Sequence, residues 1–396
     1  MRCVAATPAR VLAASPGDRF YAICFAMIAK LILVAIGATQ GATATLVDVA
    51  SARRAIGTPS AAATAARIEQ HASRGSTDAL VGELRAVLAD PTLEAAAQEW
   101  LLESGLHGLR RLPATPAARA LVAELSTRAP RIFARVEPEH GSHAVPLYDV
   151  GAVARYTERD WIRGEARLAA TKALALGNAD ALEAWLEQDD SPRAMAVRSG
   201  ILDAWRATNA KQLAGQRAML VAAMHAGRDA DRLAFELARR LRDPELYSLT
   251  IGHAEPAVAL AAVLAAEREL DSLTALGVLR EAADREPIAS AALLAIGRLA
   301  AADSAAQQVL LDRLSDPVSG DSAAAALARI DDPGVTARLG THLKEARDET
   351  TRRRVALALR LNGGPAARDA LGHLVESKQG SPQLRKEVAA WLARGR

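Results

Sequence analysis

The feature that most constrains this chain is an internal repeat in its C-terminal half. Turn-like helix starts recur at Glu255-Pro256, Glu286-Pro287, Asp316-Pro317, Glu349-Thr350 and Ser381-Pro382. Their spacings are 31, 30, 33 and 32 residues. After each start comes an Ala/Leu-rich segment, a short break with Asp, Gly or Pro, and a second segment with leucines three or four residues apart. A period of this length is typical of repeated helix pairs.

Local chemistry supports helices at these positions. Proline fits the first turn of a helix, an acidic residue before it suits the positive helix N-terminus, and glycine suits the turn between two helices. The second segments carry the pairs Leu310/Leu314, Leu339/Leu343 and Leu371/Leu374. Because one helix pair cannot bury its apolar face alone, neighbouring pairs must stack.

Composition agrees with closely packed helices. Close to a quarter of the residues are alanine, 50% are hydrophobic and only 3% are aromatic. An all-β protein would use more β-branched and aromatic residues, and a disordered chain would not be half apolar. The sequence therefore predicts an all-α protein, an α-solenoid of stacked helix hairpins.

The repeat resembles the HEAT-like repeats, especially the short bacterial variety first known from phycobilin-lyase subunits. The matching residues are clearest at Pro287, Ala291, Ala292 and Ile296, followed by Leu310 and Leu314. The resemblance covers about residues 255–396 and extends with less regular spacing to Trp161. It implies a curved solenoid whose concave face binds a partner, usually a protein. Lyase chemistry is not implied, because the matching residues are those that pack the repeats.

The N-terminal region predicts export. Translation from Met27 gives a short basic start with Lys30, an apolar run at Leu31–Ala38 and a small-residue cleavage site after Ala44. The alternative is an uncleaved anchor over Phe20–Ala38, which makes a membrane-tethered interaction protein. Eight apolar residues are too few to span about 30 Å of hydrocarbon, so cleavage is favoured.

Cleavage would change the chemistry of the chain. The precursor has 49 basic and 46 acidic residues, and removal of residues 1–44 leaves 45 of each. Both cysteines, Cys3 and Cys24, would also be lost, and with them thiol catalysis and thiolate metal ligands. A neutral mature chain gives no electrostatic reason to expect nucleic acid as a partner. An Arg-dominated basic set and abundant alanine suggest a GC-rich genome, so the expected compartment is a Gram-negative periplasm, with secretion as the alternative.

One segment interrupts the helical pattern. Residues 45–130 are expected to form a helical cap or degenerate repeats, and 160–396 the solenoid, whereas 131–159 form an insertion. Within it, IFARVE and AVPLYDV flank a polar connection. We expect a small β-hairpin or ordered loop near 131–150, with Pro146 confining its strand to a sheet edge and helices resuming near Val150.

The insertion also gathers the candidate site residues. Glu139, His140 and His143 could form a metal or hydrolytic cluster, but the His-x-x-His spacing across a glycine lacks the helical geometry of known metal motifs. Partner binding by His140, His143 and Tyr148 is favoured, since loops on rigid scaffolds often carry recognition.

Other candidates have structural explanations. The five tryptophans lie in Ala/Leu-rich helical segments and are expected in the core, and Arg352-Arg353-Arg354 is expected to be a solvated helix face. Gly363-Gly364 suits a turn between helices, and no Gly-x-Ser-x-Gly motif occurs. We therefore expect no catalytic, cofactor-binding or metal-binding residues, and the leading hypothesis is an exported, non-enzymatic scaffold or adaptor that binds a protein.

Overall fold

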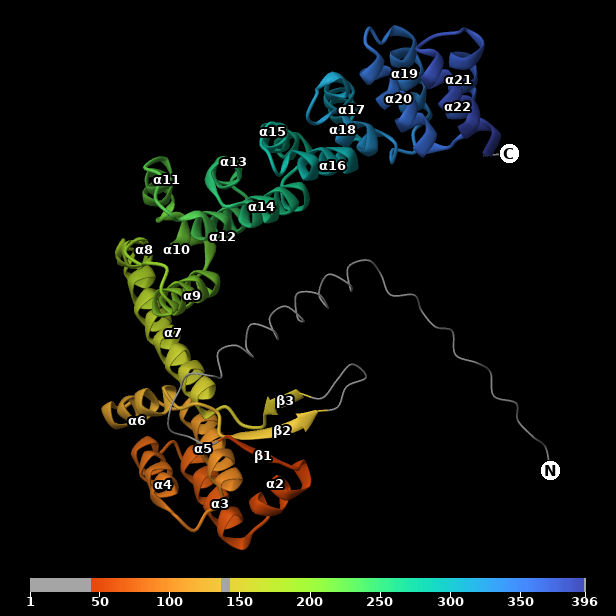
Figure 1. Ribbon diagram of the computed structural model, residues 1–396. Coiled ribbons are helices and arrows are strands. Elements are labelled where there is room, and N and C mark those ends of the chain that lie inside the picture. Colours follow the sequence, from red (N-terminus) through yellow and green to blue (C-terminus); the bar gives the residue numbers. More distant parts are fainter. Residues whose placement is uncertain (1–43, 137–142, 395–396) are drawn as a thin grey trace, which may run out of the picture. The chain divides into compact units, whose positions relative to one another are not determined.

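The computed structural model describes residues 44–136 and 143–394, and Figure 1 shows that helices dominate them. Contacts within the chain divide it into two compact units, Met1–Glu158 and Arg159–Arg396. The division falls inside helix α7 (Val150–Leu176), so α7 contributes residues to both units. The predicted all-α class is confirmed.

The first unit is organised around helix α5. Its helices are α2 (Val49–Ile56), α3 (Pro59–Ser73), α4 (Thr77–Ala89), α5 (Ala95–Leu109) and α6 (Pro116–Ser126). Helix α5 packs against α2, α3 and α4, and it buries Leu101, Leu102 and Leu106 completely. Thr58 and Thr115 cap α3 and α6 through their side-chain oxygens. Residues 45–130, which were expected to be helical, contain the helices α2–α6.

A three-stranded sheet completes this unit. Its strands are β1 (Thr45–Val47), β2 (Ile132–Val136) and β3 (His143–Pro146), in the order β1-β2-β3. The antiparallel pairing of β2 with β3 confirms the predicted hairpin, and Pro146 lies in an edge strand as expected. The parallel pairing of β1 with β2 was not predicted. Helices resume at Val150, where α7 begins.

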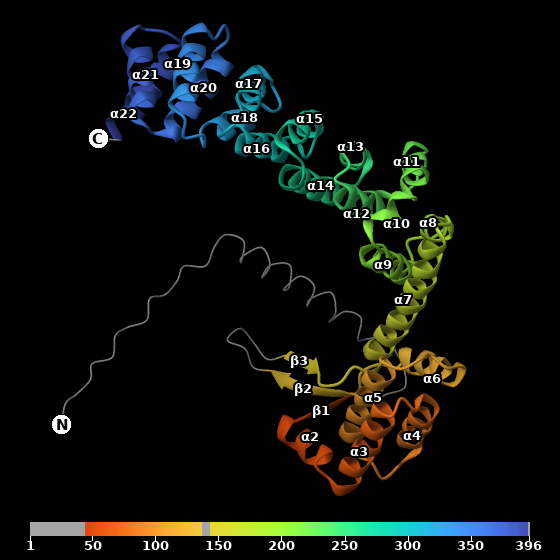
Figure 2. The ribbon, with the colours of Figure 1, turned by 180° about the vertical axis from the view of Figure 1, so that it is seen from behind.

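The second unit consists of two rows of helices, which Figures 1 and 2 show side by side. The first row contains α9 (Pro192–Ala207), α12 (Asp231–Leu241), α14 (Pro256–Glu269), α16 (Ala289–Leu299), α18 (Gly320–Leu327), α20 (Glu349–Asn362) and α22 (Pro382–Arg394). The second row contains α8 (Asp180–Leu186), α11 (Arg217–His225), α13 (Pro244–His253), α15 (Ser272–Ala282), α17 (Ser304–Asp312), α19 (Pro333–Glu345) and α21 (Pro365–Glu376). The short helix α10 (Ala210–Ala214) precedes α11, and a 3₁₀ turn, η1 (Arg313–Ser315), follows α17.

Stacking of these helices is continuous. Each first-row helix contacts the next first-row helix along the chain. One hydrophobic core runs from Ala170 to Val388, and it includes all six leucines of the predicted second-segment pairs. A Cβ at Gly297 would lie 3.0 Å from the Cβ of Ala326, which shows how closely α16 and α18 approach. The structure therefore has the predicted stacked helix pairs, and small residues allow their close packing.

The helix starts differ from prediction at two repeats. Pro256 and Pro382 begin their helices as expected. Pro287 and Pro317 instead lie in turns before α16 and α18. In the second case the carboxylate of Asp316 accepts hydrogen bonds from the backbone N–H groups of Val318 (2.9 Å) and Ser319 (2.8 Å), which stabilises a turn rather than a helix.

The expectation for the arginine run was wrong at Arg354. This residue is only 6% exposed. Its guanidinium donates hydrogen bonds to the carbonyl oxygens of Leu314 (3.1 Å), Asp316 (2.6 Å) and Pro317 (3.1 Å). Arg354 therefore joins α20 to the turn before α18 and is not part of a solvated face.

The predicted export signal and the alternative membrane anchor lie almost entirely before the residues that the structure describes. Within 44–136 and 143–394, no helix combines the length and hydropathy needed to cross a bilayer. The predicted signal, Cys3 and Cys24 lie outside the described residues, apart from Ala44 at the proposed cleavage point.

Candidate functional site

The structure describes only part of the predicted partner-binding segment. Glu139 and His140 lie outside the described residues, and His143 begins strand β3. Tyr148 follows β3 and is partly buried; this burial, and then the charge of Glu103 on α5, raise the pKa of its hydroxyl. The next residue, Asp149, caps α7 by accepting a hydrogen bond from the N–H of Ala152 (2.8 Å). The described part of this segment thus anchors the start of α7.

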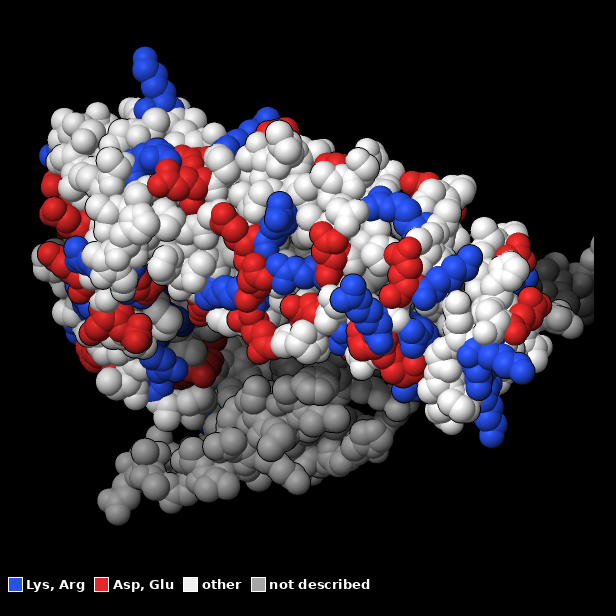
Figure 3. Space-filling view, turned by 90° about the horizontal axis from the view of Figure 1, so that it is seen from above, with Lys and Arg blue, Asp and Glu red and all other residues white. Residues whose placement is uncertain are grey.

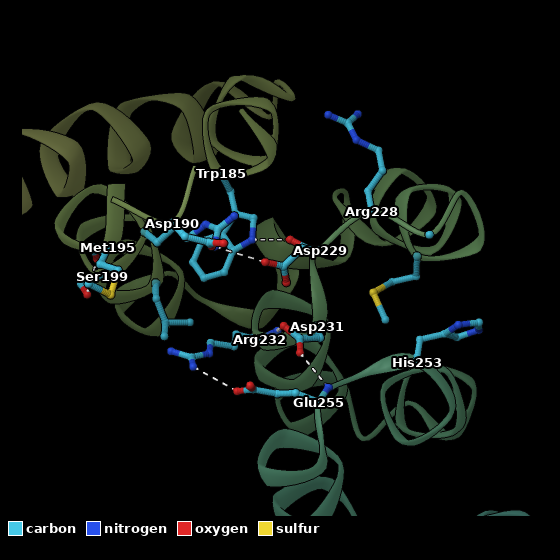
Figure 4. Close-up of a pocket in the computed structure, with 14 residues that line it drawn as sticks. Trp185, Asp190, Met195, Ser199, Arg228, Asp229, Asp231, Arg232, His253 and Glu255 are labelled. Atoms are coloured by element: carbon cyan, nitrogen blue, oxygen red, sulfur yellow. Dashed lines mark hydrogen bonds and ion pairs between the residues drawn. The ribbon is translucent and has the colours of Figure 1, made fainter. Parts of the chain in front are cut away.

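A polar pocket lies elsewhere, in the second unit, at the starts of three successive first-row helices. We call it the α9–α12–α14 pocket, and Figure 4 shows its lining. Its volume is about 630 Å³. The lining residues come from α8, α9, α11, α12 and α13, from the loops between them and from the residue before α14: Trp185, Asp190, Met195, Arg198, Ser199, Leu202, Met224, Gly227, Arg228, Asp229, Asp231, Arg232, His253 and Glu255.

Local turn chemistry brings these residues together. Helix α11 ends with Gly227 in the left-handed conformation (φ 71°). The N–H of Gly227 donates to the carbonyl of Met224 (2.9 Å), and that of Arg228 donates to the carbonyl of Ala223 (3.0 Å). This is the hydrogen-bond pattern of a Schellman motif, for which glycine is favoured. The turn directs residues 228–231 back toward α9.

One side of the pocket is held by Arg198 of α9. Its guanidinium forms an ion pair with Asp229 (3.2 Å) and donates a hydrogen bond to the carbonyl of Gln188 (3.0 Å). It also lies 5.6 Å from the ring centre of Trp185. The indole N–H of Trp185 in turn donates to the carbonyl of Asp229 (2.7 Å). These contacts fix the α11–α12 loop against α8 and α9.

The opposite side joins α12 to α14. Arg232 forms an ion pair with Glu255 (3.2 Å), which is the residue before α14. The carboxylate of Asp231 accepts hydrogen bonds from the backbone N–H groups of Arg232 (2.7 Å) and Glu255 (3.4 Å). Burial, and then the nearby charge of Asp229, raise the pKa of Asp231. Two carboxyl groups therefore lie close together at the pocket wall.

Apolar groups complete the lining. Met195 and Leu202 of α9 and Met224 of α11 contribute side chains, and Met195 is 54% exposed. Arg228 and His253 extend away from the carboxylates in Figure 4. The pocket thus combines a charged wall with flexible apolar surface, a composition suited to binding a side chain or small ligand.

The hydroxyl of Ser199, in the pocket lining, is bonded to the helix backbone. The hydroxyl of Ser199 donates to the backbone carbonyl of Met195 (2.7 Å), one turn earlier in α9. A nucleophilic serine would instead donate to a general base. Among the described residues, no group of three or more His, Cys, Asp or Glu side chains is placed to hold a metal ion.

Two further pockets in the second unit have different linings. One, of about 650 Å³, is formed mainly by alanine and apolar side chains of α7, α8 and α9. The other, of about 560 Å³, lies among α18, α20 and α22, and its charged residues Arg353 and Arg354 are engaged in ion pairs with Glu387 and Asp321. The α9–α12–α14 pocket is distinguished by its closely spaced carboxylates.

No protein-family model matches the chain, and a search of curated proteins finds no significant match.

The sequence did not single out this pocket. Its residues come from α8, α9 and the loop between them, and from residues 224–255, most of which lie in the region where the repeat spacing is irregular. The available signal was the run Gly227-Arg228-Asp229-Ala230-Asp231, a glycine turn followed by two aspartates. Nothing in that run indicates that Trp185 and Glu255 lie beside it.

Proposed function

We propose that the protein is an exported, non-enzymatic scaffold or adaptor that binds a protein partner. The observation that carries this proposal is the α9–α12–α14 pocket, which is built from three successive helix pairs. Repeat proteins present extended surfaces of this kind, and each additional pair adds contact area. The HEAT-like sequence pattern supports the same function.

Beyond the pocket, ion pairs also join neighbouring first-row helices toward their C-terminal ends. Arg206 of α9 pairs with Glu236 of α12 (3.4 Å), and Arg239 of α12 pairs with Glu269 of α14 (3.0 Å). Figure 3 shows basic and acidic side chains interspersed over the face it displays. A surface already held in place loses little conformational entropy on binding, which favours recognition.

A second contact surface is proposed at the hairpin. His143 and Tyr148 flank the exposed edge residues Ala144 and Val145, and His140 is the third member of the predicted set. An exposed strand edge can pair with an extended segment of another protein. The hairpin would then add to the contact made by the pocket.

Export is proposed from the sequence pattern that ends at Ala44, and a Gram-negative periplasm is the expected compartment. Intact-mass measurement on the protein from its native host tests cleavage. We expect a mature chain that begins at Thr45. A chain that retains Lys30 would favour the membrane-tethered form.

Site-specific photo-crosslinking tests partner binding. A photoreactive phenylalanine analogue at Met195, on the pocket rim, is expected to give an adduct of one defined mass in cells. The same analogue at Asp369, exposed on α21, serves as the control and is expected to give none. Absence of an adduct at Met195, or equal adducts at both positions, would contradict binding at the pocket.

A further inference from the structure

We infer that the α9–α12–α14 pocket receives a basic side chain, lysine or arginine, from the protein partner. This inference rests on the proposed function and adds the chemistry that the pocket selects.

The balance of charge on the pocket wall favours a cationic ligand. Asp190 and Asp229 share Arg198 as their ion-pair partner, and Glu255 has Arg232. Asp231 has no side-chain cation within ion-pair distance among the described residues; its carboxyl group interacts with the backbone N–H groups of Arg232 and Glu255 and with the carboxyl group of Asp229. Arg228 extends away from these carboxylates (Figure 4). The lining therefore has four acidic residues and three arginines, of which only Arg198 and Arg232 pair with the acidic groups, and a ligand cation would offset the remaining negative charge.

Burial strengthens this preference. Withdrawal from water and the neighbouring Asp229 both make the charged form of Asp231 unfavourable, which raises its pKa. A ligand cation near both carboxylates would reverse the second effect. An anionic ligand would be repelled by these carboxylates. It would also find no free N–H donor at Arg232 or Glu255, because both backbone N–H groups already donate to Asp231.

The apolar part of the lining fits the rest of a basic side chain. Met195, Leu202 and Met224 contribute surface next to the carboxylates. Lysine and arginine carry three or four methylene groups, which pack on such surface while the charged end forms ion pairs. A volume of about 630 Å³ accommodates either side chain together with water.

Calorimetric titration of the purified protein tests the inference. The probes are the N-acetyl methylamides of lysine, arginine and norleucine, and norleucine is the uncharged analogue of lysine. We expect the two basic probes to bind at least tenfold more tightly than norleucine. Equal binding of norleucine would overturn the inference.

Variants connect the binding to the pocket. Asp231→Asn is expected to weaken the basic probes at least tenfold, whereas Asp369→Asn on α21 is expected to leave them unchanged. Leu202→Trp, which fills the apolar side without altering charge, is expected to weaken them as well. Unchanged binding by Asp231→Asn would overturn the inference, and circular dichroism verifies that each variant is folded.

A small free amine could supply the same positive charge as a partner's basic side chain. Titration with 1,4-diaminobutane distinguishes it, because a site for a partner's side chain should bind the amino-acid probes more tightly than the diamine. Tighter binding of the diamine would overturn the assignment to a partner.

If crosslinking at Met195 gives an adduct but the basic probes do not bind, only the side-chain inference fails. If the adduct itself is absent, the proposed function fails.

Discussion

The guanidinium of Arg354 occupies the space that the missing side chain of Gly320 leaves open. A Cβ at Gly320 would overlap that guanidinium and lie 2.7 Å from the carbonyl oxygen of Leu314. Arg354 uses the same position to bind the carbonyl groups of the turn before α18. The contact between consecutive repeats here depends on one buried arginine and one glycine.

Gly320→Ala should therefore destabilise the protein. The added methyl group would displace Arg354 and its hydrogen bonds, and we expect a loss of about 1–3 kcal/mol in the free energy of unfolding. Gly372→Ala is the matched control, because Gly372 lies within α21 with no atom near its Cβ position. There alanine should stabilise the helix by up to about 1 kcal/mol. Thermal unfolding followed by circular dichroism measures both, and equal shifts for the two variants would contradict this account of Gly320.

In the first unit, Glu99 should be far more important to stability than exposed acidic residues. Its side chain is fully buried, and Arg128 donates to it at 2.7 Å and 3.0 Å. Glu99→Ala would leave the partly buried Arg128 without its partner, and we expect a cost of about 3–5 kcal/mol. Arg85→Ala, which breaks the exposed pair with Glu124, should cost less than about 1 kcal/mol. Urea unfolding measures the difference, and a loss below about 1 kcal/mol for Glu99→Ala would show that the buried pair contributes little.

Two aspartates near α12 and α13 should affect stability in opposite directions. The pKa of Asp231 is raised, by burial and then by Asp229, so its ionisation disfavours the folded state at neutral pH. Asp231→Asn should therefore stabilise the protein slightly at pH 7. That gain should disappear as the pH falls from the raised folded pKa toward the unfolded value of about 3.9.

Asp243 provides the comparison. Burial acts to raise its pKa, but hydrogen bonds from Arg217 and from the N–H of Leu246 outweigh burial, and the net pKa is lowered. Ionised Asp243 therefore stabilises the folded protein. This stabilisation is present above a pH of about 3.9 and is lost as the pH falls through the pKa of Asp243 in the folded state. Asp243→Asn should therefore destabilise the protein at pH 7 and not at low pH. Unfolding between pH 2 and 7 checks both signs, and a destabilising Asp231→Asn at pH 7 would contradict the assigned cause.

The repeated helix pairs could be predicted because each repeat carries its own local signals. Leu310 and Leu314 are buried as expected, since their spacing places them on one helix face. The β2–β3 hairpin could be predicted from the break in helical period. Strand β1 could not, because Thr45–Val47 has only three residues and pairs with a strand that lies far away in sequence.

The pocket could not be predicted because its parts come from distant segments. Trp185 is 44 residues before Asp229, the residue whose carbonyl it binds. The burial of Arg354 could not be predicted for a similar reason, because the carbonyl groups that it binds belong to the preceding repeat. In both cases the residue types fit an exposed helix equally well, and only stacking of the helices decides their environment.

We propose that carboxylates of the α9–α12–α14 pocket hold a protein partner. The most direct measurement is the yield of the photo-crosslinked adduct at Met195 in three backgrounds: the unaltered protein, Asp231→Asn and Asp369→Asn. We predict that the yield falls at least tenfold with Asp231→Asn and is unchanged with Asp369→Asn. An adduct of undiminished yield with Asp231→Asn would contradict the claim.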